Sequence, residues 1–246
     1  MFRTCVLLCC LLAAWPAAAV ERTTAVDAVL AIDRLDVETF MMLYDESDRA
    51  QVQRVRQQLT TVSTLLVPLL PTLPATEAVM GNAEAWQVVQ TSIVGDRRAH
   101  GMIDTGYDAR TLAELRTAVP TLQRAIHQAY ALDKPVSPEE AALLQASELF
   151  AVYIRGAASP LGNFSDNNDE SGGEDLATMV ADFDRQLAAL RARHAQDPQA
   201  STVLNQVQMK WQFLRGTILR HAQQSTPAIV YRHGMDIVDR LRTLRG

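Results

Sequence analysis

Apolar residues recur every three or four positions along nearly the whole chain after residue 20, and this spacing places side chains on one face of an α-helix. Alternation at every second position, which is typical of strands, is almost absent. One segment shows the helical spacing most clearly, with steps of 4, 3, 4, 3 and 4 residues: Leu176, Val180, Phe183, Leu187, Leu190 and His194. The pattern predicts an all-α protein.

Four helices are expected in the first half, at about 24–44, 49–66, 76–103 and 109–130. Proline marks the ends and irregularities of this half, because it lacks a backbone N–H and clashes with the preceding helical turn. Pro68 and Pro71 are expected to close the second helix, and Pro120 is expected to kink the fourth.

Four more helices are expected in the second half, at about 138–158, 176–194, 198–221 and 227–244. Ser137 can cap the first of them, Pro138 suits the first helical position, and Glu140 completes a capping box. Asp197-Pro198 caps and opens the helix at 198–221, and Thr226-Pro227 opens the helix at 227–244. Between the expected second-half helices, residues 159–175 read as a long, flexible, acidic loop.

The two halves resemble each other in organisation. In each, the third helix carries a tryptophan on its buried stripe, Trp86 or Trp211, and the fourth is associated with a proline. The pattern predicts two tandem antiparallel four-helix bundles with up-down-up-down topology, residues 20–134 and 135–246. An internal duplication and the general likeness of four-helix patterns both explain the similarity, and periodicity does not distinguish two bundles from one eight-helix body.

The N-terminus has the features of a secretory signal peptide at residues 1–19. Arg3 precedes an apolar core, and the segment ends in the small residues Ala17-Ala18-Ala19. Cleavage after Ala19 would leave a mature chain without cysteine, because Cys5, Cys9 and Cys10 are the only cysteines. We therefore expect an exported protein without disulfides, suited to a bacterial periplasm or to secretion, with no stable membrane insertion after processing.

Charge and missing motifs exclude several functions. Without the expected leader the chain has 22 Lys and Arg against 28 Asp and Glu, which does not favour nucleic-acid binding. No Cys-x-x-Cys-His, Glu-x-x-His or His-Glu-x-x-His motif occurs, and no nucleophile elbow or phosphate-binding glycine loop is present. We expect no cofactor, no metal and no enzymatic activity. A haem or metal carrier remains a minor alternative, through His233 with Met235 or His100 with Met102.

Three residues of the second half are candidates for ligand binding: Arg155, Trp211 and Arg215. A guanidinium that points between helices can hold a small anion with two hydrogen bonds, and an indole can form a platform beside it. The alternatives are that Trp211 fills a core layer and that the arginines lie along the surface.

Three features of residues 137–246 carry a resemblance to a known family: the helix 143–155, Trp211 with Leu214, and the final helix 229–241. With these features the segment resembles the PilJ-type domain, the periplasmic helical sensor domain of type IV pilus methyl-accepting chemotaxis transducers and nitrate-sensing histidine kinases. It implies an exported, sensor-like helical bundle that recognises a small ligand, an anion or a signalling partner. The alternative is a structural or adaptor protein that docks on a membrane receptor or pilus component.

Overall fold

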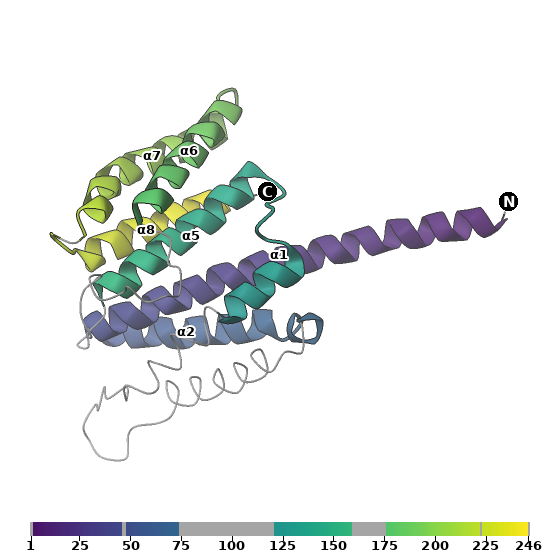
Figure 1. Ribbon diagram of the computed structural model, residues 1–246, viewed down its shortest axis with the longest axis horizontal. Coiled ribbons are helices and arrows are strands. Elements are labelled where there is room, and N and C mark those ends of the chain that lie inside the picture. The colour runs from purple at the N-terminus through teal and green to yellow at the C-terminus, as the bar shows by residue number, and fades with distance from the viewer. Residues whose placement is uncertain (1, 46–47, 74–120, 159–175, 222, 246) are drawn as a thin grey trace, which may run out of the picture. The chain divides into compact units, whose positions relative to one another are not determined.

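A computed structural model describes residues 2–45, 48–73, 121–158, 176–221 and 223–245, and these residues form helices and no strand. In chain order the helices are α1 (Phe2–Tyr44), α2 (Arg49–Leu66), the short 3-10 helix η1 (Leu70–Thr72), α5 (Pro138–Ala157), α6 (Leu176–Arg193), α7 (Pro198–Leu219) and α8 (Pro227–Arg242) (Figure 1). Residues 121–130 are also helical. The all-α prediction is confirmed for this part of the chain.

Several expected features lie outside the described residues. They are the third helix at 76–103, most of the fourth helix with its kink at Pro120, Trp86, His100 with Met102, and the acidic loop 159–175.

Helix α1 begins at Phe2, well before the expected start near Thr24. The sequence before Thr24 is rich in alanine and leucine, which have high helix propensity, and it contains no glycine. The apolar periodicity locates the amphipathic part of a helix and not its first residue. The predicted end at Tyr44 agrees with the structure.

The predicted caps of α5 and α7 form. The Ser137 hydroxyl accepts a hydrogen bond from Glu140 N–H at 3.1 Å, and the Asp197 carboxylate accepts from the N–H groups of Gln199 and Ala200 at 2.9 and 3.1 Å. These bonds satisfy backbone donors that have no partner within the helix. In a capping box the Glu140 carboxylate would accept from the backbone N–H of Ser137 itself. Here it accepts from the preceding N–H, that of Val136, at 3.3 Å.

The chain divides into two compact units. The first comprises residues 1–32 and 59–133, and the second comprises 33–58 and 134–246. In the first unit the buried stripe of α2 continues with Leu59, Val62 and Leu66. The helix 121–130 ends at Ala131, which has a φ of 49°, and the Arg22 guanidinium donates to the Tyr130 and Ala131 carbonyls there.

In the second unit α5 packs against α6 and α8, and α7 packs against the same two helices (Figure 1). The predicted stripe of α6 is buried from Leu176 to Leu190, and His194 at its end is half-buried. The largest side chains of this core are Trp211, Tyr153, Phe150 and Phe183. On α8 Gly234 is buried and the preceding His233 is half-buried. This core fixes the positions of the side chains described below.

Candidate functional site

Two of the three predicted ligand-binding residues meet at one acid. The Trp211 indole N–H donates to Oδ1 of Asp184 at 2.6 Å, and Nε of Arg215 donates to Oδ2 of the same carboxylate at 2.7 Å. Trp211 and Arg215 are four residues apart on α7, so one face of that helix presents both groups to Asp184 on α6. The structure therefore brings Trp211 and Arg215 together around the carboxylate of Asp184.

Trp211 also fills the core, as the alternative to ligand binding expected. Its ring meets Phe183 edge-on with centroids 4.8 Å apart and Phe150 with centroids 6.4 Å apart. The residue is 1% exposed, so only its N–H edge reaches toward the surface, where Asp184 lies. A buried indole N–H needs an acceptor, and Asp184 supplies one.

Arg215 keeps part of its guanidinium accessible. Its side chain is 47% exposed, and Asp184 is its only partner among the described residues. Because Nε of Arg215 pairs with a carboxylate oxygen of Asp184, the two charges together are close to neutral. A partly exposed ion pair of this kind contributes about 0–1 kcal/mol to the stability of the fold.

Arg155, the third candidate, binds a different acid. Its Nε and Nη2 atoms lie 2.8 and 2.5 Å from Oδ2 of Asp36, which is buried on α1. The negative charge of Asp36 raises the pKa of Arg155 above its ordinary value. The pair joins α5 to the part of α1 that belongs to the second unit.

A buried polar cluster around Glu38 was not anticipated from the sequence. Oε2 of Glu38 accepts hydrogen bonds from Gln51 Nε2 at 2.5 Å and from the Tyr231 hydroxyl at 2.8 Å. Two guanidinium groups also lie near the carboxylate, with Arg54 Nε 3.4 Å from Oε2 and Arg34 Nε 3.5 Å from Oε1. The cluster links α1, α2 and α8, and it leaves the Glu38 carboxylate well partnered although the residue is 2% exposed.

The cluster also perturbs Tyr231. Burial and the neighbouring Glu38 carboxylate raise the pKa of Tyr231 to about 12, because both disfavour the phenolate. The surrounding helix is buried on all sides. From Ala25 to Met42 every residue except Asp27 and Arg34 is buried, although the segment also carries the acids Asp33, Asp36 and Glu38. Buried carboxylates on such a helix need hydrogen-bond donors or cationic side chains nearby, because burying an unpaired charge is costly.

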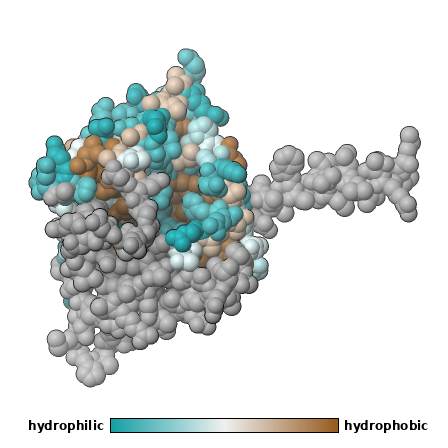
Figure 2. Space-filling model, viewed as in Figure 1, coloured by the Kyte–Doolittle hydropathy of each residue, from teal (hydrophilic) through white to brown (hydrophobic). Residues whose placement is uncertain are grey.

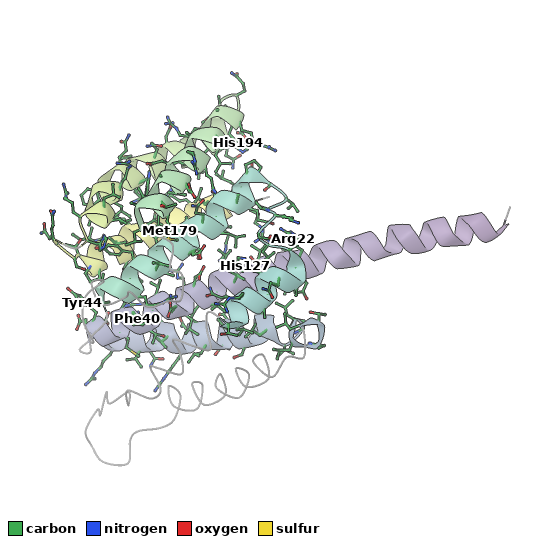
Figure 3. The ribbon with its side chains drawn as sticks, viewed as in Figure 1. Arg22, Phe40, Tyr44, His127, Met179 and His194 are labelled. Carbon is green, nitrogen blue, oxygen red and sulfur yellow. The ribbon has the colours of Figure 1, made fainter. Side chains whose placement is uncertain are left out.

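His194 and His221 each contact an oxygen atom of the protein. His194, at the C-terminal end of α6 (Figure 3), places Nε2 2.7 Å from the buried Glu139 carboxylate, which also lies 3.2 Å from Arg193. His221 Nδ1 lies 3.0 Å from the Ile218 carbonyl. Within the described ranges no three His, Cys, Asp or Glu side chains gather in a way that could hold a metal ion.

Three exposed apolar side chains, together with the half-buried His233, form a surface on α7 and α8, which we call the α7–α8 face: Met209, Phe213, Ile229 and His233. Met209 is 66% exposed, Phe213 58% and Ile229 41%. The rings of Phe213 and His233 meet edge-on across the two helices with centroids 5.5 Å apart. Figure 2 shows hydrophobic residues reaching the surface among hydrophilic ones on the side of the molecule that it draws.

Comparison of the chain with protein-family models, with curated proteins and with solved structures finds no match. Over the part of the chain that the structure describes, no helix is both long and apolar enough to cross a membrane.

Proposed function

We propose that this protein is an exported, non-catalytic, sensor-like helical binding protein that docks on a signalling partner through the α7–α8 face. The observation that carries the proposal is the exposure of Met209, Phe213 and Ile229 along one pair of packed helices. Contiguous apolar side chains at a surface mark sites of protein interaction more often than isolated ones do. Aromatic residues and methionine are also enriched at such interfaces.

The partners of Asp184, Asp36 and Glu38 give these acids a structural role. Each accepts hydrogen bonds from side chains of neighbouring helices. These contacts hold the helices together and make the acids part of the framework. The framework would present the α7–α8 face as a rigid surface, which lowers the entropy lost on docking.

The finer architecture belongs to the same proposal. The mutual packing of α5, α6, α7 and α8 supports a four-helix bundle in the second half, as the resemblance to the PilJ-type sensor domain implies. The leader-like residues 1–19 support export. A tandem arrangement with a first bundle in residues 20–134 completes the proposed organisation.

Site-specific crosslinking in the cells that make the protein tests the proposal. A photoreactive phenylalanine analogue replaces Phe213 in one variant and Val136 in a control, because Val136 is 72% exposed and lies before α5, outside the α7–α8 face. We expect a protein adduct of one defined mass from position 213 and none from position 136. Equal adducts at the two positions, or none at position 213, would overturn the proposal.

The half-exposed guanidinium of Arg215 favours a second candidate, the recognition of a small anion beside Asp184 and Trp211. A ligand that binds only the folded state raises the melting temperature. Nitrate, acetate and amino acids are therefore added separately to the wild type and to R215Q. The control is R185Q, because Arg185 is an exposed arginine on α6 that pairs with Asp182. A ligand-dependent rise in melting temperature that is lost in R215Q and kept in R185Q supports this candidate. If no ligand raises the melting temperature of the wild type, the candidate is excluded for these ligands.

A further inference from the structure

The hairpin of α7 and α8 is basic although the chain as a whole is acidic. Residues 198–242 contain six Lys and Arg against two Asp, a formal charge of +4, whereas the whole chain has a formal charge of −5. The apolar side chains of the α7–α8 face therefore lie in the most basic part of the second half.

The two acids of this hairpin are already paired. Asp236 lies 2.5 Å from Arg240 Nε and 3.6 Å from Lys210 Nζ, and Asp239 lies 2.8 Å from Arg34. Arg220 and Arg232 are both exposed, and neither has an acidic partner among the described residues. Their positive charge is available to a molecule that docks on the surface.

The α7–α8 face follows the line along which these two antiparallel helices pack, and we call this line the seam. Three contacts cross it in order, from Gln206 with Arg240, through Lys210 with Asp236, to Phe213 with His233. Along α7, Met209 and Phe213 are four residues apart, and Ile229 and His233 have the same spacing on α8. This spacing puts each pair on one helical face, one turn apart.

Arg220 and Arg232 lie beside the apolar seam. Arg220 follows Phe213 by seven residues, which is two helical turns, and Arg232 follows Ile229 by three. The Arg220 guanidinium lies over Gly216, because a Cβ at that glycine would be 3.6 Å from Arg220 Nη2. Cationic groups thus flank apolar ones along the helix direction.

We infer that the docking element of the partner is an acidic amphipathic helix. Its apolar residues, at spacings of three and four, would cover Met209, Phe213 and Ile229, and its carboxylates would pair with Arg220 and Arg232. This inference rests on the proposed docking function and adds the chemistry of the partner. A helix fits the seam because the contact groups repeat at helical spacing along both elements.

A membrane surface with anionic lipids would also attract basic and apolar groups, but the geometry favours a helix. The Phe213 ring is held edge-on against His233, so it is not free to insert among acyl chains.

The test uses the purified full chain and two fluorescent peptides with the same leucine stripe, one with glutamate and one with lysine on the polar face. We expect the glutamate peptide to bind about tenfold more tightly than the lysine peptide, and added salt to weaken its binding. The variant F213S should weaken binding of the glutamate peptide about tenfold or more, and V136S should not. The double variant R220E/R232E should reverse the preference between the peptides.

All four substituted positions are exposed, so each variant is expected to fold. A thermal melt of each variant checks that it does. Equal binding of the two peptides, or binding that F213S leaves unchanged, would overturn the acidic-helix partner. Co-sedimentation with phosphatidylserine vesicles in the absence of peptide binding would overturn it in favour of a membrane. A protein adduct at position 213 without a peptide preference would leave the docking function standing, whereas loss of both results would remove both proposals.

Discussion

Gly234 on α8 lies directly against the ring of Phe150 on α5. A Cβ atom built at residue 234 would stand 2.8 Å from Cγ and from Cδ1 of Phe150, closer than carbon atoms approach in folded proteins. Phe150 is fully buried and its ring also meets Trp211, so it has little room to move away. Glycine thus lets α5 and α8 approach each other in the middle of the core.

The G234A variant is expected to lower the free energy of unfolding by about 1–3 kcal/mol, because the added methyl group overpacks the core. This loss outweighs the gain of about 1 kcal/mol that alanine brings to a helix interior. Urea unfolding of the purified protein measures the change. The matched control is G216A on α7, where the new Cβ would only contact the flexible Arg220 side chain at 3.6 Å, so that variant should be as stable as wild type or more stable. Equal effects at the two positions would contradict this account.

Local rules of sequence were enough to predict α5 to α8. Ser137, Asp197 and the prolines that follow them fix two helix starts, and apolar spacing fixes the buried faces. The same rules placed Trp211 in the core and left its other role open. Where local signals agree with each other, the predicted elements agree with the structure.

The partners of the charged side chains could not be predicted in this way. Arg155 and its partner Asp36 are 119 residues apart, and Tyr231 and Glu38 are 193 apart. No local pattern encodes such pairs, because they depend on how distant helices come together. For the same reason the sequence did not indicate that residues 33–58 lie in one compact unit with residues 134–246.

Removing the centre of the Glu38 cluster should destabilise the second unit. E38A is expected to cost about 1.5–3 kcal/mol, mainly because the Tyr231 hydroxyl loses its acceptor. Gln51 keeps its bond to the Glu38 backbone carbonyl, and Arg34 and Arg54 keep their pairs with Asp239 and Asp48. Y231F removes a single hydrogen bond to that carboxylate and should cost about 1.5–3 kcal/mol. The control is Y44F, because Tyr44 is 53% exposed, and its change should stay within about 0.5 kcal/mol. Chemical unfolding measures all three, and a Y231F variant as stable as Y44F would contradict the role of this bond.

Alkaline pH should weaken the same cluster. The pKa of Tyr231 is raised to about 12 in the folded protein from its ordinary value of 10.0. Folding therefore favours the neutral phenol. The stability that this preference adds to the folded state is fully present below pH 10 and is lost as the pH rises through about 12. A difference titration of tyrosine absorbance, wild type minus Y231F, should show one group ionising near the raised value. Ionisation of that group at the ordinary pKa would contradict the arrangement around Glu38.

Acid should release the contact between the start of α5 and the end of α6. Burial alone would raise the pKa of Glu139. Hydrogen bonds from its own backbone N–H, His194 and Ser137, together with the charge of Arg193, lower this pKa below its ordinary value of 4.5. A lowered carboxyl pKa means that folding favours the ionised form. Its stabilising contribution is therefore present above the unfolded-state pKa and is lost as the pH falls through the folded-state pKa.

The E139Q variant tests this contribution because an amide keeps the shape of the side chain and can still accept a hydrogen bond from His194 at 2.7 Å, but it carries no charge. Urea unfolding of wild type and variant is measured between about pH 6 and pH 3. We expect wild type to be more stable at the upper end and the difference to shrink as the pH falls below 4.5. R193Q removes only one of the groups that lower the pKa, so it should show a smaller change in the same direction. A difference between wild type and E139Q that stays constant over the whole range would show that the charge of Glu139 does not stabilise this end of the helices.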